Sequence, residues 1–208
     1  HDRTEIEGVH WAGTPDRESV ARPDLASLPS PYLDGAISVL PGQPFVRTET
    51  QRGCRYRCSF CQHREAGRRL RNRALGPQRV RDELALLAQR RTREIAILDP
   101  IFNEGEYALE LLEHMRELEL GARISIQARF ETVTEAFLDS ARSLNIVPEF
   151  GLQTIHRDET HLIGRNNNLP RVERAIDLLH ARDIPFEVSL IYGLPNQTPE
   201  SFASSVAW

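Results

Sequence analysis

The residues best suited to chemistry in this sequence are three cysteines within the stretch RGCRYRCSFCQHREAG, residues 52–67. Cys54, Cys58 and Cys61 are all the cysteines of the 208-residue chain. An odd number of thiols within eight residues argues against a disulfide framework and for a reducing compartment, which we take to be the cytoplasm. Thiolates are soft ligands that suit zinc or an iron–sulfur cluster. Three of them leave one position of a tetrahedral metal site for another ligand.

Two kinds of metal site are compatible with this spacing. His63 could complete a Cys3His zinc site, which would make the chain a non-catalytic zinc-binding module. However, His63 follows Cys61 by only two residues, and no second C-x2-C pair is present. An iron–sulfur cluster with one open iron agrees better with the spacing C-x3-C-x2-C, and the open iron could then bind a substrate or a cofactor.

Composition narrows the classes of partner. The net charge is −4, and no apolar run approaches the ~20 residues of a membrane span. Residues 64–93 hold ten arginines against three acids, which suggests either a solvated helix face or a groove for an anion. We interpret this segment as a solvated face, because no stacking aromatic residues lie among the arginines. A nucleic-acid partner is therefore not expected, and neither is a membrane.

The elements that must position the cysteines alternate regularly. Five strands are predicted, at 45–51, 94–99, 122–128, 145–153 and 184–193. Helices are predicted over 78–91 and 105–119, after a capping box of Thr132 and Glu135, from Pro170, and from Thr198 with Pro199. Such alternation predicts a parallel sheet, either doubly wound or part of a barrel. In both folds the loops after the strands face one cavity, and the cysteines lie in the first of these loops.

The ends of the chain indicate a larger protein. Residues 1–44 contain six prolines and show little periodicity, so we interpret them as an extended linker. The chain begins at His1, its single methionine is Met115, and it stops at Trp208 within a predicted helix. We therefore expect these residues to be a piece of a longer protein.

The stretch CRYRCSFC, with Phe60 just before the last cysteine, resembles the signature of the radical S-adenosylmethionine (SAM) superfamily. The resemblance covers residues 45–208. It implies an α/β fold, a partial (β/α)6 barrel with parallel strands that is truncated here after about five β/α units. It also implies that the three cysteines hold a [4Fe–4S] cluster and that SAM chelates the fourth iron, where a reduced cluster cleaves SAM to a 5′-deoxyadenosyl radical.

Further SAM-binding residues follow from the same resemblance. The segment DPIFNEG occupies the place of a motif that contacts the SAM amino group, which points to Asp99, Asn103 and Glu104. Glu104 has two alternative roles. It could cap the following helix, since acids are common at helix N-termini, or its carboxylate could occupy the open iron.

The later loops supply other candidates. GLQT resembles the fourth-strand motif of relatives of oxygen-independent coproporphyrinogen oxidase, which points to Gln153 near SAM. HLIGR resembles a segment whose arginine pairs with the SAM carboxylate, so Arg165 is a candidate, with Arg129 as its rival. IYGLP resembles the motif that lines the adenine, which points to Tyr192 and Gly193.

Two segments sharpen the resemblance to one subgroup. LPSPYLDG, residues 28–35, and LDPIFN resemble segments of the cobalamin-dependent (class B) radical SAM methyltransferases. This subgroup implies that residues 1–44 follow an N-terminal cobalamin-binding domain of the same chain. It also implies an external electron donor and C-methylation of a small molecule, such as an amino acid like tryptophan or a natural-product intermediate. Alternatives are an RNA-modifying methylthiotransferase and a cobalamin-linked cyclase.

Overall fold

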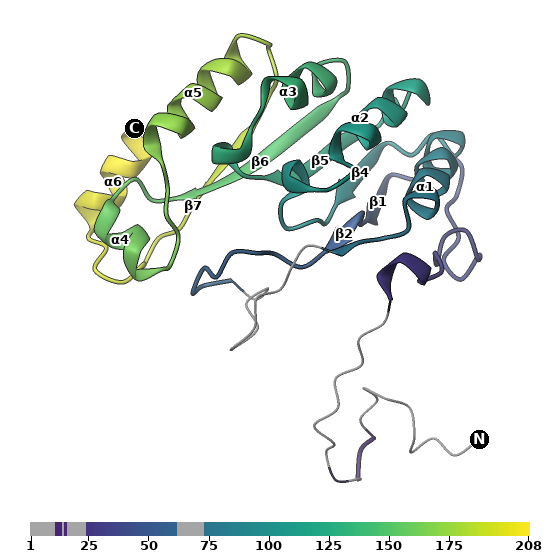
Figure 1. Cartoon of the computed structure of the whole chain (residues 1–208), viewed down its shortest axis with the longest axis horizontal. Coiled ribbons are helices and arrows are strands. Elements are labelled where there is room, and N and C mark those ends of the chain that lie inside the picture. Colours follow the sequence, from purple (N-terminus) through teal and green to yellow (C-terminus); the bar gives the residue numbers. More distant parts are fainter. Residues whose placement is uncertain (1–10, 14, 16–23, 62–72) are drawn as a thin grey trace.

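The computed structural model describes residues 11–13, 15, 24–61 and 73–208 of the chain. Its centre is a five-stranded parallel sheet whose strands follow one another in chain order (Figure 1). The strands are β1 (Phe45–Thr48), β4 (Glu94–Ile97), β5 (Arg123–Ala128), β6 (Ile146–Gln153) and β7 (Glu187–Leu190). The expected alternation of strands and helices along a parallel sheet is confirmed.

The helices decide between the two folds that the sequence left open. They are α1 (Pro77–Gln89), α2 (Ala108–Glu117), α3 (Glu135–Ala141), α4 (Arg157–Leu162), α5 (Leu169–His180) and α6 (Pro199–Ala207). The series α1, α2, α3 and α5 runs along one face of the sheet, each helix in contact with the next (Figure 1). A doubly wound sheet reverses its strand order and carries helices on both faces, whereas sequential strands with one layer of helices form a sector of a barrel. The described part of this chain has sequential strands and one such layer, so its fold is a sector of a barrel.

The two faces of the sheet differ in burial because side chains alternate along each strand. The outward face packs on the helices and carries buried aliphatic residues such as Ile95 and Ile124. Near the ends of the strands, Phe130 stacks on Phe150 with ring centroids 4.0 Å apart. The inward face is more open and more polar. It carries the functional side chains described below.

A short antiparallel ladder flanks the cysteines in the sequence and was not predicted. The strand expected over 45–51 is divided into β1 and β2 (Gln51–Arg52), and β2 pairs with β3 (Arg73–Ala74). The segment that carries the cysteines (residues 53–61, the cysteine segment) therefore starts from a paired strand, and it leaves the sheet at the carboxyl end of β1. This arrangement places the cysteines over the mouth of the barrel sector.

Three local predictions need correction. The N-cap of α3 is Thr134, whose hydroxyl accepts from Phe137 N at 3.2 Å, whereas Thr132 ends a 3-10 turn. Helix α2 starts at Ala108 and not at residue 105, because a 3-10 turn at Phe102–Glu104 comes first. Helix α4 was not predicted. In contrast, the predicted helix start at Thr198 is confirmed, with Pro199 in the first turn.

The described part of the proline-rich segment packs against the domain. A 3-10 turn at Leu25–Ser27 lies against β3, and Leu25 and Val39 belong to the hydrophobic core. The serine hydroxyl of Ser30 accepts from the N–H groups of Tyr32 and Leu33 and thereby forms a tight turn. Within the described residues, no helix is long and apolar enough to cross a membrane.

Candidate active site

A cavity of about 210 Å³ lies at the carboxyl ends of the strands, where the sequence predicted the loops to meet. It is lined by Cys54, Tyr56, Cys58, Phe60, Cys61, Pro100, Ile101, Gln127, Ala128, Arg129, Glu149, Gly151, Gln153, Arg165 and Ser189. The cysteine segment and the ends of four strands thus contribute to one wall. Of the predicted SAM-binding residues, four lie here: Phe60, Arg129, Gln153 and Arg165.

All three cysteine thiols are free and face this cavity. Cys58 is buried, and burial is the main cause that raises the pKa of Cys54. Ser59 N donates to Ile163 O at 2.8 Å, which ties the cysteine segment to the end of α4. Within the described residues, no three His, Cys, Asp or Glu side chains are gathered around a single point that could hold one ion. His63 lies outside the described residues.

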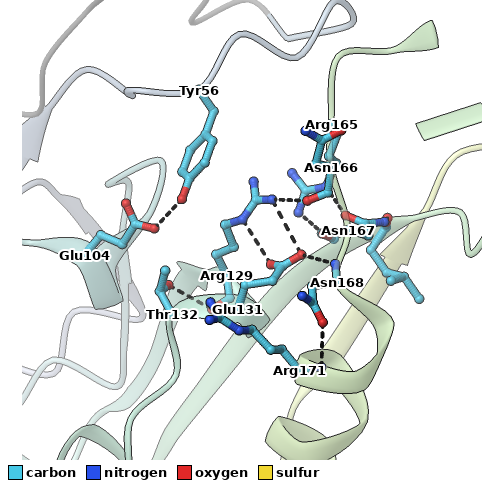
Figure 2. A network of polar contacts seen from close by, with 12 residues as sticks. Tyr56, Glu104, Arg129, Glu131, Thr132, Arg165, Asn166, Asn167, Asn168 and Arg171 are labelled. Atoms are coloured by element: carbon cyan, nitrogen blue, oxygen red, sulfur yellow. Dashed lines mark hydrogen bonds and ion pairs between the residues drawn. The ribbon is translucent and has the colours of Figure 1, made fainter. Parts of the chain in front are cut away.

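Arg129 is held by both its backbone and its side chain (Figure 2). The side-chain amide of Asn103 binds both backbone polar groups of Arg129. Its Oδ1 accepts from Arg129 N at 3.0 Å, and its Nδ2 donates to Arg129 O at 2.9 Å. The guanidinium pairs with Glu131, with Nε 3.0 Å from Oε2, and its Nη2 donates to Asn166 O at 2.8 Å. Arg129 is only 5% exposed, yet its Nη1 has no hydrogen-bond partner among the described residues.

Arg165 lies across the same cavity and is engaged differently. Its Nε donates to Asn167 Oδ1 at 3.2 Å, its Nη2 donates to Gly151 O, and its Nη1 lies 4.0 Å from Cys58 Sγ. Burial lowers the pKa of Arg165, and the nearby charge of Arg129 lowers it further. The buried guanidinium of Arg129 and the half-buried guanidinium of Arg165 make this cavity a favourable place for an anion, because each has lost hydration that a carboxylate can replace.

Gln153 brings a second unpartnered atom to the cavity. It has a positive φ of 71°, and its Oε1 is buried without a partner among the described residues. Gly151 leaves room for the Gln153 amide, since a Cβ at position 151 would lie 2.5 Å from Gln153 Nε2. Buried polar atoms in a folded protein are normally paired, so the free atoms of Arg129 and Gln153, which both line the cavity, are candidates for contacts with a ligand.

Asp99 and Asn103 lie near the cavity but do not line it. Asp99 is fully buried, and its carboxylate accepts from Thr50 N at 2.7 Å and from Gln51 N at 3.2 Å. Asn103 binds the backbone of Arg129, as described above. The structure thus gives both side chains hydrogen bonds to protein groups and not a place on the cavity wall.

Glu104 is also turned away from the lining of the cavity. Its Oε1 accepts from the Tyr56 hydroxyl at 2.7 Å, and its Oε2 forms an ion pair with Arg55 Nε at 2.9 Å. It lies in the 3-10 turn before α2, whose N-cap is Tyr107, so it does not cap that helix. The carboxylate thus contacts the cysteine segment through a hydrogen bond at Oε1 and an ion pair at Oε2, although Oε2 accepts no well-oriented hydrogen bond from the described residues.

Tyr192 and Gly193 do not line the cavity. The side chain of Tyr192 is 71% exposed and stands edge-on to Phe202, with ring centroids 5.1 Å apart. Gly193 has a φ of 87°, which favours glycine, and its N–H donates to Gln197 Oε1 at 2.6 Å. The loop after β7 therefore forms a closed turn, and Ser189 of β7 itself reaches the cavity instead.

Sequence reasoning missed eight residues of the cavity, of which four have polar side chains: Tyr56, Gln127, Glu149 and Ser189. Ser189 Oγ donates to Glu149 Oε1 at 2.6 Å across β6 and β7, and Glu149 is the one acid on the described wall. A signal was present for Gln127 and Glu149, because each lies between two buried residues of its strand, whereas Ser189 has no buried neighbour in β7. Polar residues at inward positions of barrel strands are candidates for ligand contacts.

The arginine-rich segment 64–93 lies partly outside the described residues. On α1, Arg79 pairs with Glu83 at 3.0 Å, and Arg81 pairs with Glu110 of α2 at 3.2 Å. The Arg81–Glu110 pair is exposed, as expected for a solvated helix face, whereas the Arg79–Glu83 pair is buried, with the Glu83 side chain only 2% exposed.

The cysteine motif, the parallel strands in chain order and the cavity at their carboxyl ends define a radical SAM domain. Residues 48–208 match the radical SAM superfamily, so the chain belongs to this superfamily of enzymes. Membership implies a [4Fe–4S] cluster and SAM. The donor set agrees with such a cluster, because three thiols face a space that is larger than a single-ion site and that contains two unpartnered polar atoms.

Individual relatives refine this comparison. The cobalamin-dependent radical SAM methyltransferase TokK of Streptomyces tokunonensis is 28% identical over 200 residues, which cover 88% of this chain and 29% of TokK. The anaerobic magnesium-protoporphyrin IX monomethyl ester cyclase of Rubrivivax gelatinosus is 25% identical and covers 96% of this chain and 38% of the cyclase. The solved structure of the radical SAM methyltransferase TsrM of Kitasatospora setae superposes with a TM-score of 0.67 at 23% identity, over 80% of this chain and 34% of TsrM. The chain thus spans about a third of the length of these relatives.

Proposed function

We propose that this chain is the core of a cobalamin-dependent radical SAM methyltransferase that methylates a carbon of a small molecule, such as an amino acid or a natural-product intermediate. The observation that carries the proposal is a cavity that combines three cysteine thiols with two arginines, Arg129 and Arg165. Cys54, Cys58 and Cys61 would hold the [4Fe–4S] cluster. When bound, the cluster supplies the electron that cleaves SAM, and cobalamin supplies a methyl carrier.

The residues of the wall match the charged groups of SAM. The free Nη1 of Arg129 would donate to the α-carboxylate, and the free Oε1 of Gln153 would accept from the α-amino group. Arg165 is the weaker candidate for the carboxylate, since each of its nitrogens already has a protein partner. Glu149, bonded to Ser189, would face the ribose hydroxyls or the sulfonium charge from the inner surface of the barrel.

Methyl transfer is favoured by the first relative, since TokK is described as a cobalamin-dependent radical SAM methyltransferase. Residues 1–44 would then connect the barrel to a cobalamin-binding domain in the longer protein. A cobalamin-linked cyclase is the second candidate, because the similarity to the magnesium-protoporphyrin ester cyclase extends over 96% of this chain. Both functions need an external electron donor.

The decisive experiment follows the methyl group. The full-length protein, purified without oxygen and supplied with a low-potential reductant, is incubated with methyl-labelled SAM and a panel of amino acids and natural-product precursors. We expect label in protein-bound cobalamin before label in any product. Replacing Cys54, Cys58 or Cys61 by Ala should remove iron and abolish product labelling.

Two results would contradict the proposal. A full-length protein that binds no cobalamin would exclude the cobalamin-dependent reaction, and a cysteine variant with normal iron content would exclude the assigned cluster ligands. Product formed with no transfer of label would favour the cyclase.

A further inference from the structure

We propose that Tyr56 is a positioning residue that aims Arg129 into the SAM site and couples it to the cysteine segment. This inference rests on the proposed binding of SAM at the cavity. Tyr56 lies between Cys54 and Cys58, so its backbone is part of the short segment that carries two of the proposed cluster ligands. The ring itself forms part of the cavity wall.

The hydroxyl end of Tyr56 is anchored on a buried carboxylate (Figure 2). Its hydroxyl donates to Glu104 Oε1 at 2.7 Å, and Glu104 is paired with Arg55 at 2.9 Å. The side chain of Glu104 is 7% exposed, so its charge needs these partners. Tyr56 is consequently fixed at its backbone by the cysteine segment and at its hydroxyl by the turn after β4.

The face of the same ring carries Arg129. The guanidinium Cζ lies 4.1 Å from the ring centroid of Tyr56, which is within the range of a cation–π contact. Glu131 and Asn166 bind the Nε and Nη2 side of the group. With one edge bonded and one face stacked, the guanidinium cannot rotate freely, and its unpartnered Nη1 is left as the donor available to a ligand. Tyr56 and Glu131 thus act on Arg129 from two directions.

The contacts can be separated by two substitutions. Tyr56→Phe removes the hydroxyl bonds to Glu104 and Arg55 and keeps the ring against Arg129. Tyr56→Leu removes these bonds and also the ring contacts with Arg129 and Arg55. Tyr107→Phe and Tyr107→Leu are matched controls, because Tyr107 is partly buried at the start of α2 and does not line the cavity. Each variant is prepared as full-length protein, reconstituted without oxygen, and assayed for iron content, for SAM dissociation constant and for the cluster EPR spectrum with and without SAM.

We expect both Tyr56 variants to load iron and to show an unchanged EPR spectrum without SAM. Tyr56→Leu should weaken SAM binding by roughly tenfold and Tyr56→Phe by about threefold, because a desolvated cation–π contact is the larger loss. The change in the EPR spectrum on SAM addition should need correspondingly more SAM. The Tyr107 controls should bind SAM as the unsubstituted protein does.

A double-substitution cycle distinguishes positioning from a general packing role. If Tyr56 acts through Arg129, Tyr56→Leu should weaken SAM binding little further in an Arg129→Gln background. Additive losses would overturn the proposal, as would a Tyr56→Leu protein that binds SAM normally. If the Tyr56→Leu protein loads no cluster, the SAM affinity of Tyr56→Phe becomes the test. Normal SAM affinity in Tyr56→Phe would overturn the role of the hydroxyl anchor. An unsubstituted protein that binds neither cluster nor SAM would instead refute the proposed function itself, and the present inference with it.

Discussion

At the residue scale, Asp99 supports the cysteine segment through hydrogen bonds, although its side chain does not line the cavity. Its carboxylate accepts from the N–H groups of Thr50 and Gln51 and from the Thr50 hydroxyl, and so it joins the end of β4 to the start of the cysteine segment. Burial raises the pKa of Asp99 to about 6, although these hydrogen bonds favour the ionised form. The ionised carboxylate is therefore costly at neutral pH, and it persists because three donors surround it.

This raised pKa predicts a specific dependence of stability on pH. Between the ordinary pKa of about 4 and the native pKa, the folded protein holds a proton that the unfolded chain has lost, so the contribution of Asp99 to stability falls as pH rises. Asp99→Asn is neutral and lacks this effect. Relative to that variant, the apoprotein should lose up to ~3 kcal/mol of unfolding free energy from pH 4 to pH 7 in urea titrations. Parallel pH profiles for the two proteins would contradict the assignment.

The sequence identified which loops contain functional residues better than it identified where each side chain points. Arg129, Gln153 and Arg165 were predicted and line the cavity. Asn103 and Glu104 come from an equally well placed loop, but they bind Arg129 and Tyr56 instead. The position of a residue after a strand fixes its distance from the cavity, whereas its rotamer and partners depend on residues that are remote in sequence.

At the scale of elements, Gly76 links the N-terminal segment to the barrel. It is the N-cap of α1, and a Cβ at this position would lie 2.6 Å from the backbone oxygen of Ala26. Such a contact is possible only for glycine, because the obstacle is a carbonyl group and not a flexible side chain. The turn Leu25–Ser27 is thereby held against β3 and the start of α1.

Gly76→Ala should therefore destabilise the protein by about 1–3 kcal/mol, the usual cost of inserting a methyl group into a packed contact. Gly121→Ala is the matched control, since no atom lies within 4 Å of its added Cβ. The control should be neutral or stabilising by up to ~1 kcal/mol, because alanine restricts the unfolded chain. Urea denaturation measures both, and equal midpoints for the two variants would show that the turn can move without cost.

Element order was more predictable than element boundaries. Hydrophobic periodicity identified all five strands of the sheet and most of its helices, because their apolar faces must be buried. The ladder of β2 and β3 escaped prediction, since each strand has only two residues and pairs across the cysteine segment. Helix α4 has six residues, which is too short for a periodic pattern to be recognised.

At the scale of the whole molecule, the sheet has two open edges, at β1 and β7. Parallel sheets are normally covered on both faces, because their crossover connections place helices there. Here Val188 of β7 remains 40% exposed, and β7 has no outer neighbour among the described residues. From the resemblance to a six-unit barrel we propose that a further strand pairs with β7 in the full-length protein.

Residue-resolved hydrogen exchange tests this expectation. In a chain of residues 1–208, the alternate amides of β7 (Glu187–Leu190) that point away from β6 should exchange as fast as loop amides, and in the full-length protein they should be protected. The central strand β5 (Arg123–Ala128) is the internal control, because it is paired on both sides and should be protected in both chains. Protected β5 amides would show that the shorter chain is folded. With that control satisfied, fast exchange of β7 in the full-length protein would mean that no strand adds at this edge, and the barrel would then end at the sheet described here.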